Sequence, residues 1–463
     1  MKRPVTALFA ASFTLAACNG LPASSPTAHY GAAALTHRVH PRYTSPIQHV
    51  IIMVQENRTP DNLFHYLKGA DIAEYALDKK QLVKLTPMSM AAKFDLNHSH
   101  AGYLLDYNNG KMDGFGSHLT HKNSAFGPFH YVPYNEAKPY LEMARQYAFA
   151  DRMFQTNQSG SFPSHQYLVS GDANAEPDTP WEVSSNAYAS KVGPRPGTGC
   201  DANRFSYVKT INPYDGTDGP TPYPCFDRPA LSDLLDSQGV SWKYYQHELG
   251  PGLWHAYDAI QHVRYGPDYA NVIPHPEQIL TDIKNGQLPG VSWVMPADAK
   301  HSDHPGSESS EGPSWISAVV NAVGQSQYWD STAIFVTWDD WGGWYDHVAP
   351  PQMNNYYELG FRLPLLMISP YAKPGYISHD QHEFASILNF AEETFGIPKG
   401  SLGSTDVRAD DLMDAFDFTQ TPIAFTKIKS PPFHPVVKSK DPPDDDPDDP
   451  YPGEPDNVDY STR

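Results

Sequence analysis

The segment IQHVIIMVQENR, residues 47–58, decides the fold class of this 463-residue chain. It contains a short continuous apolar run, His49 to Val54, that ends in the polar residues Gln55 to Arg58. A run that is apolar at every position is typical of a parallel strand buried on both faces. The polar residues after it mark the carboxyl end of that strand, where ligands bind in open α/β sheets.

The rest of the body alternates strand-like and helix-like segments. Apolar runs of the same kind recur at residues 291–295, 333–338 and 363–369. Helical stretches are readable at residues 137–147, 230–238, 312–324 and 384–395. This alternation predicts an α/β fold with a mostly parallel central sheet and helices on both of its faces.

Charge and composition exclude some classes of partner. The net charge is -20, and no cluster of Lys and Arg is present of the kind that binds a phosphate backbone, so we expect no nucleic-acid partner. Much of the negative charge lies in the Pro-rich acidic stretch 441–459, which cannot bury a core. We therefore predict one domain over residues 45–428, followed by a disordered tail over residues 429–463.

The N-terminus has the layout of an export signal. Lys2 and Arg3 precede an apolar run that is too short to span a bilayer and ends at Ala17. Cys18 follows in a context that resembles the lipobox of bacterial lipoproteins; an ordinary signal with a cysteine near the cut is the alternative. The prediction is a signal peptide over residues 1–17, a tether over residues 18–44, and export with a membrane anchor on Cys18 or by secretion.

The other two cysteines, Cys200 and Cys225, favour a structural disulfide. In an exported chain such a pair is a disulfide more often than a metal or catalytic site. The pair lies in a segment rich in Pro, Gly and Asn, residues 176–227, which we interpret as a loop-rich insertion over the domain.

Two pairs of polar residues follow predicted strands and suggest a metal site. Glu56-Asn57 follows the first strand, and Asp339-Asp340 follows the run 333–338. Carboxylate and amide oxygens suit a divalent cation, and adjacent acids without one would repel each other. Each pair has a simpler explanation as a helix cap or a turn, but their occurrence together favours a metal.

The segment Asp151 to Tyr167 is the candidate site of a nucleophile. It carries four hydroxyl side chains around Gly160, and Pro163 suits the first turn of a helix. Backbone N–H groups at that helix start would hold a phosphoryl oxygen. Spacing alone does not choose between Ser159 and Ser161.

Two of the 21 histidines lie in polar segments that suggest a role in proton transfer. They are His98 and His304, the latter followed by Pro305. A histidine near its ordinary pKa is a suitable general acid for a leaving alkoxide.

These segments together resemble a bacterial phosphoesterase family that contains hemolytic and non-hemolytic phospholipases C and respiratory-burst-inhibiting acid phosphatases. The resemblance covers roughly residues 47–396. Its motifs lie at residues 56–64, 97–99 with 109–115, 151–167, 241–245, 303–305 and 337–348.

The resemblance implies an alkaline-phosphatase-like core, one divalent metal ion of unknown identity and a covalent phosphoserine intermediate. The positions that match the family's metal ligands are Glu56, Asn57, Asp339 and Asp340. Ser161 matches the nucleophile, and His98 and His304 match histidines that contact the phosphoryl group or protonate the leaving oxygen. The implied activity is phospholipase C-like hydrolysis of a phosphodiester or phospholipid headgroup.

Two other functions stay open on the sequence: an acid phosphatase acting on phosphomonoesters, and an inactive lipid-anchored module that binds phosphorylated ligands. The family's late Asp-His-Thr-Ser run is replaced by residues 383–386, Glu-Phe-Ala-Ser, so the resemblance predicts the reaction type better than the substrate.

The aromatic residues Trp338, Trp341, Trp344 and Tyr345 could line a choline pocket by cation-π contact. Packing in the core is the interpretation we favour for them.

Overall fold

The computed structural model describes residues 45–93, 95–117, 127–189, 197–353 and 357–435. The predicted signal peptide, the tether and most of the predicted tail lie outside these residues. Within the described ranges no helix is both long and apolar enough to cross a membrane. The described elements form one body around a single nine-stranded sheet, with four small two-stranded sheets beside it.

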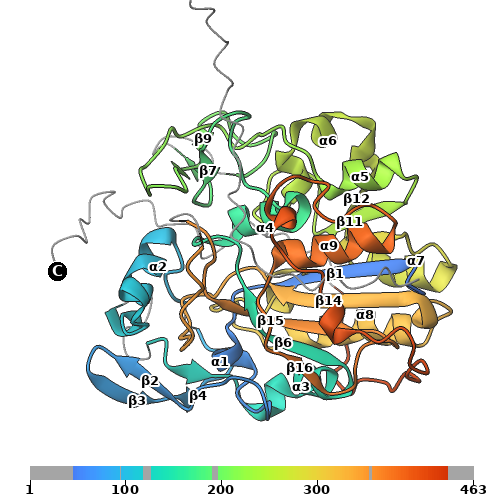
Figure 1. The fold of residues 1–463 in the computed structure, drawn as a ribbon, viewed down its shortest axis with the longest axis horizontal. Helices are drawn as coiled ribbons and strands as arrows, with labels where there is room; N and C mark the ends of the chain where they lie inside the picture. Colours follow the sequence, from blue (N-terminus) through green and yellow to red (C-terminus); the bar gives the residue numbers. More distant parts are fainter. Residues whose placement is uncertain (1–44, 94, 118–126, 190–196, 354–356, 436–463) are drawn as a thin grey trace, which may run out of the picture. The chain divides into compact units, whose positions relative to one another are not determined.

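The first apolar run forms β1 (His49–Gln55) in the middle of the large sheet (Figure 1). It pairs in parallel with β13 (Val291–Val294) on one side and with β14 (Thr332–Trp338) on the other. Beyond β13 the parallel order continues through β11 (Trp242–Gln246) to β12 (Val272–Pro274). β1, β13 and β14 are buried along almost their whole length, as the continuous apolar runs predict.

The other half of the sheet contains one reversed strand. The run at 363–369 forms β15 (Arg362–Ile368), which is antiparallel to β14 and to β6 (Ala148–Phe154). Its grouping with parallel strands was therefore wrong, because a continuous apolar run reports burial on both faces and not strand direction. β6 then pairs in parallel with β16 (Tyr376–Ser378) and β17 (His382–Glu383), so the sheet is mostly parallel as predicted.

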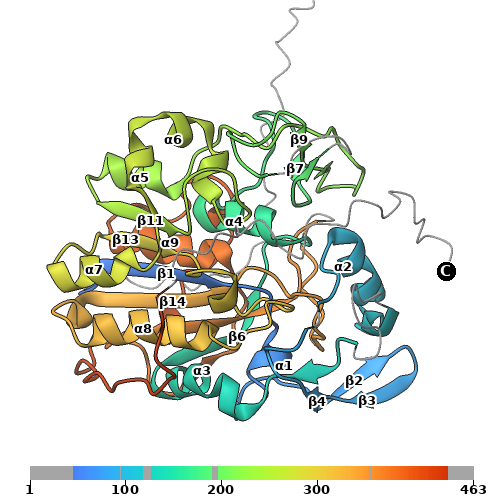
Figure 2. The same ribbon diagram turned by 180° about the vertical axis from the view of Figure 1, so that it is seen from behind.

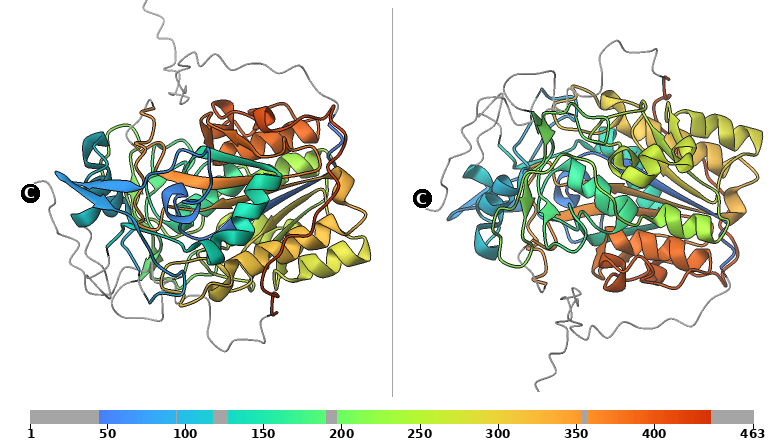
Figure 3. Two further views of the ribbon diagram at one scale, coloured as in Figure 1. Left: turned by 90° about the horizontal axis from the view of Figure 1, so that it is seen from below. Right: turned by 90° about the horizontal axis from the view of Figure 1, so that it is seen from above.

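Helices cover both faces of the sheet, which confirms the predicted fold class (Figures 1 and 2). One face carries α3 (Tyr134–Gln146) and α8 (Gly312–Gly324), with α7 (Gln278–Asn285) against α8. The other face carries α4 (Ser161–Ser170), α5 (Leu231–Ser237) and α9 (Phe384–Thr394), which contact one another. Views from below and above show the strands between the two layers of helices (Figure 3).

Smaller elements lie around the sheet. Near the N-terminus they are α1 (Pro60–Leu63), β2 (Tyr75–Asp78), β3 (Gln81–Lys84), β4 (Thr86–Pro87), α2 (His100–Tyr107) and β5 (His130–Tyr131). The insertion contains β7 (Glu182–Val183), β8 (Tyr188–Ala189), β9 (Ser206–Tyr207) and β10 (Thr210–Ile211), and α6 (Gln261–Tyr265) follows it. The predicted disulfide between Cys200 and Cys225 is present.

Candidate active site

The two acidic motifs emerge side by side from neighbouring strands. Gln55 and Trp338 are paired in the β1–β14 register, so the residues that follow them leave the sheet together. The amide of Asn57 donates to Asp339 Oδ1 over 3.2 Å, and Asn57 adopts a left-handed conformation with φ 61°. Glu56, Asn57 and both aspartates, Asp339 and Asp340, are fully buried.

Two glycines allow the loop after β14 to approach the other site loops closely. Gly342 and Gly343 have φ angles of 61° and 70°, which side chains rarely adopt. A Cβ on Gly342 would lie 2.6 Å from the carbonyl oxygen of Asn57, and one on Gly343 would lie 2.9 Å from that of Asn97. The Gly-Gly pair therefore brings together the loops that carry Asn57, Asp340 and His98.

Ser161 is the first residue of α4 and faces the acidic pairs. Its hydroxyl donates to Asp340 Oδ2 over 3.1 Å and to Glu56 Oε2 over 3.3 Å. The hydroxyl of Ser159 instead donates to the carbonyl of Ser184 in the insertion, over 2.7 Å. The structure thus separates the two serines that the sequence left equivalent: the hydroxyl of Ser161 points to the acids, and that of Ser159 points to the insertion.

The start of α4 offers fewer backbone donors than we expected for a phosphoryl oxygen. The amide of Phe162 already donates to Asn186 Oδ1 over 3.0 Å, and Pro163 has no amide hydrogen. One of the backbone N–H groups at this helix start is thus already engaged, and the proline that favours the helix start also removes one donor. Side chains must supply more of the anion binding than a bare helix terminus would.

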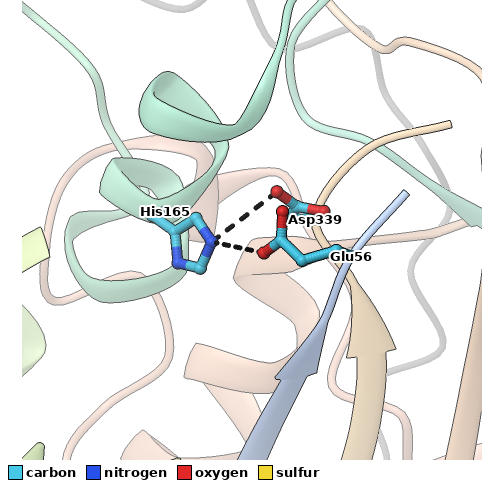
Figure 4. Close-up of side chains that lie close together, drawn as sticks. All are labelled: Glu56, His165 and Asp339. Atoms are coloured by element: carbon cyan, nitrogen blue, oxygen red, sulfur yellow. Dashed lines mark hydrogen bonds and ion pairs between the residues drawn. The ribbon is translucent and has the colours of Figure 1, made fainter. Parts of the chain in front are cut away.

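His165 is a site residue for which the sequence interpretation gave no role. Its Nε2 lies 3.3 Å from Glu56 Oε1 and 3.6 Å from Asp339 Oδ2 (Figure 4). It follows Ser161 by four residues, a spacing that places both side chains on one face of α4. That spacing was the available signal, and it became useful only once the helix start at Ser161 was known.

The donor set fits a divalent cation. One ligand atom each from Glu56, His165 and Asp339 lies within 4.8 Å of the other two. Asp339 Oδ2 is buried, and within the described part of the chain it has no hydrogen-bond partner. A buried carboxylate oxygen in that position is costly unless a cation compensates it. Mixed carboxylate and imidazole donors suit zinc or manganese as well as harder ions.

His98 and His304 extend the group beyond Asn57. Asn57 Nδ2 is 3.1 Å from His98 Nε2, and the rings of the two histidines are 5.9 Å apart. His98 Nδ1 lies 2.8 Å from the carbonyl of Leu96, and His304 Nδ1 lies 2.5 Å from that of Pro305. A carbonyl only accepts, so each Nδ1 carries the hydrogen, which directs the chemistry of both rings to Nε2.

Asp303 fixes the loop that carries His304. Its backbone carbonyl accepts from Arg58 Nε and Nη2 over 2.9 and 2.6 Å, and its Oδ2 accepts from the hydroxyl of Tyr140 over 2.6 Å. Burial raises the pKa of Asp303 to about 6, against the opposing effects of the Tyr140 hydrogen bond and Arg58. The His304 loop is thereby tied to Arg58, which directly follows the Glu56-Asn57 pair.

All seven residues predicted from the sequence thus lie in one connected group. Contacts link Glu56, Ser161 and Asp340, and others link Asp339, Asn57 and His98, with His304 beside His98. Adjacent residues in the chain join the two sets. His165 contacts both of them.

Two other groups of acids and histidine occur among the described residues, and each already contains a cation. In the first, Arg362 Nη2 lies 2.6 Å from Asp346 Oδ1, and His347 Nδ1 lies 2.7 Å from Asp61 Oδ2. We interpret it as an internal ion network that joins the loop after β14 to β15. An arginine at its centre leaves little reason for a metal there.

The second group surrounds His382, which is buried. Its Nδ1 lies 2.7 Å from Asp410 Oδ2, and its Nε2 lies 2.8 Å from the hydroxyl of Ser378. Burial would lower the pKa of His382, but the carboxylates of Asp410 and Asp414 outweigh it and raise the pKa to about 9. The histidine is itself the cation of this group.

The aromatic residues near the acidic motifs are packed. Trp338 and Trp341 are fully buried, and Trp344 is 3% exposed. Trp338 contacts the main core, and Trp341 belongs to a second cluster with Tyr345. The guanidinium of Arg58 lies over Trp344 at 5.2 Å. The structure therefore supports core packing for these side chains rather than an open choline pocket.

A family model and several known proteins match most of this chain. The model of the Phosphoesterase family matches residues 47–398. The chain is 25% identical over 438 residues to the non-hemolytic phospholipase C of Burkholderia pseudomallei, covering 81% of this chain and 59% of that protein. It is also 25% identical over 438 residues to phospholipase C A of Mycobacterium tuberculosis, covering 82% and 79%. Among solved structures, a Vibrio parahaemolyticus protein of the alkaline phosphatase superfamily aligns over 85% of this chain and 74% of its own, with 11% identity and a TM-score of 0.39.

Proposed function

This chain belongs to the Phosphoesterase family, and on that premise we propose that it hydrolyses phosphate esters by a phospholipase C-like reaction with Ser161 as the nucleophile. The observation that carries the proposal is the position of the Ser161 hydroxyl. It lies within hydrogen-bond distance of carboxylates from the ends of two adjacent strands, those of Glu56 and Asp340. A hydroxyl so held is oriented for attack on a phosphorus atom.

We propose that one divalent metal ion binds at this site. Its ligands would come from Glu56, Asn57, Asp339 and Asp340, with His165 as an added nitrogen donor. A bound cation there would neutralise charge on the phosphoryl oxygens. Because Asn57 Nδ2 bonds to His98, the amide oxygen is the atom with which Asn57 would bind the cation.

The reaction follows from the residues in place. The Oγ of Ser161 forms a bond to phosphorus while the bond from phosphorus to the leaving oxygen breaks, and a carboxylate that accepts the hydroxyl hydrogen takes its proton. The leaving oxygen takes a proton from a histidine. We assign this role to the pair His98 and His304, because in both rings a backbone carbonyl holds Nδ1 and the exchangeable proton is then at Nε2. Water then attacks the phosphoserine and releases the second product.

Acid phosphatase activity remains the second candidate. The burial of Trp338 and Trp341 favours it, because these rings are then not available as a choline-binding wall. Substrate preference would instead depend on the residues around Ser161, which include Ser184 and Asn186 of the insertion.

We also propose that the chain is exported and anchored through Cys18.

The test compares hydrolysis of p-nitrophenyl phosphate and p-nitrophenyl phosphorylcholine, with and without a chelator. Ser161→Ala should abolish turnover, whereas Ser159→Ala, whose hydroxyl faces the insertion, should retain most of it. Acid-quenched enzyme should carry one phosphoryl group on Ser161 by mass spectrometry. Preference for the diester supports the phospholipase, and preference for the monoester supports the phosphatase. Absence of turnover on both esters after metal addition would favour a binding module.

A further inference from the structure

The hairpin of β2 and β3 exposes apolar side chains on its outer face. Tyr75 is 45% exposed, Leu77 41% and Leu82 71%. In the antiparallel register Leu77 lies opposite Leu82, and Tyr75 lies opposite Lys84. Because opposite residues of a pair share a face, these four side chains form one surface, which we term the outer face.

The inner face of the hairpin already provides the contacts that the fold needs. Ala76 is fully buried in the aromatic cluster that contains Trp341 and Tyr345, and Val83 packs against the same cluster. The carboxyl group of Asp78, which shares this face, lies against Gly116. The leucines of the outer face are therefore not required for packing within the described part of the chain.

The outer face and its turn are basic. Lys79 and Lys80 form the turn, Lys84 ends β3, and all three are exposed. Among the described residues none of these lysines forms an ion pair with a carboxylate. Glu74, which precedes β2, is exposed, whereas Asp78 belongs to the inner face. This basic patch stands out on a chain whose net charge is -20.

The hairpin is joined directly to the loops of the candidate active site. The hydroxyl of Tyr345 accepts from the amide of Leu77 over 3.4 Å, and the carbonyl of Tyr345 accepts from the hydroxyl of Thr59 over 2.8 Å. Thr59 follows the Glu56-Asn57 pair, and Tyr345 follows the Gly-Gly pair. The hairpin projects from the body beside α1 and α2 (Figures 1 and 3).

We propose that the outer face of this hairpin docks onto an anionic phospholipid bilayer. Exposed leucines and a tyrosine next to exposed lysines combine the two attractions that hold peripheral proteins at a lipid surface: burial of apolar area and attraction to negative headgroups. The inference deepens the proposed function, because an enzyme that cleaves phospholipid headgroups has to approach a bilayer. Through Tyr345, docking would present the active-site loops to that surface.

A site-specific probe tests the contact. In the full chain carrying Cys18→Ser, Leu82→Cys is labelled with a polarity-sensitive fluorophore and mixed with vesicles of phosphatidylcholine and phosphatidylglycerol in equal parts. The emission should shift to the blue and be quenched by spin-labelled lipid. The matched control is Tyr265→Cys on α6, which is 61% exposed and should show no shift. Equal responses at both positions, or none at either, would overturn the proposal.

Variants separate this proposal from the catalytic one. Leu77→Asn with Leu82→Asn should weaken vesicle binding at least about tenfold, and Lys79→Glu with Lys80→Glu should remove the preference for anionic vesicles. Both double variants should hydrolyse p-nitrophenyl phosphate as the parent does. If the parent hydrolyses no ester yet the label still shifts, the proposed function fails and the docking surface stands. A shift that depends on protein concentration without vesicles would instead identify a second copy as the occupant.

Discussion

Replacing Asp339 by asparagine should have opposite effects on stability with and without a bound metal ion. Ligand oxygens of Asp339 and Glu56 lie within 4.8 Å of each other, and both side chains are fully buried. At an effective dielectric constant of about 20, two unit charges at that distance repel by about 3 kcal/mol. Removing one charge from the metal-free protein should relieve most of that repulsion.

The substitution keeps the local hydrogen bonds, so the charge is the variable. Asp339 Oδ1 accepts from the amides of Asn57 and Asp340 over 3.2 and 2.8 Å, and an asparagine oxygen can accept both. In a domain of this size, 1 kcal/mol moves the midpoint of thermal unfolding by about 1 °C. The chelated variant should therefore melt about 3 °C above the chelated parent, and the metal-saturated variant should melt below the metal-saturated parent.

Differential scanning fluorimetry with a chelator, and then with each candidate cation in excess, measures both changes in the melting midpoint: the increase without metal and the decrease with it. The control is Asp282→Asn, because the carboxylate of Asp282 is buried and paired with Lys243 at 2.6 Å. This substitution should lower the midpoint equally with and without metal. If Asp339→Asn lowers the midpoint by the same amount with and without metal, Asp339 is a structural residue and the metal assignment is wrong.

Three further outcomes follow from the same structure. Gly342→Ala should lower the free energy of unfolding in urea by about 2 kcal/mol or more, because the added Cβ would lie 2.6 Å from the Asn57 carbonyl oxygen. The control is Gly239→Ala, where φ is 68° and no atom of the described residues lies near the added Cβ, so only the backbone strain of about 1 kcal/mol should be lost. His165→Asn should weaken zinc or manganese binding by at least about tenfold in calorimetric titration and weaken magnesium binding less, and equal losses would count against a nitrogen ligand. His382 has a folded pKa of about 9, above its usual 6.5, so its contribution to stability is complete below pH 6.5 and disappears as the pH rises through 9. Urea unfolding should show a loss of roughly 3 kcal/mol over that window in the parent, and His382→Gln should remove most of this dependence.

The sequence predicted those features that are encoded locally. Continuous apolar runs identified β1, β13 and β14, and polar residues at their ends identified the edge where Glu56 and Asp339 meet. The direction of β15 was not readable, because strands buried on both faces carry the same apolar pattern whichever way they run. Direction depends on the connection between strands, and that is a property of the whole chain.

The candidate site was only partly readable for a related reason. Residue types and a family resemblance selected Ser161, but only the tertiary structure shows its hydroxyl against Asp340 while that of Ser159 faces the insertion. His165 received no role because its significance depends on the helix start four residues earlier. The loss of helix-terminal donors likewise required knowledge of the contact between Phe162 and Asn186.

The insertion contacts the nucleophile loop, whereas the acidic pairs come from the sheet. Ser184 and Asn186 reach Ser159 and Phe162 from a segment stapled by its own disulfide, and Glu56 and Asp339 extend directly from paired strands. Under the proposed function, the acids that would act on the ester and the insertion residues beside the nucleophile therefore belong to separate stretches of the sequence. Substitutions in the insertion would then change the preference for an ester without replacing the acids.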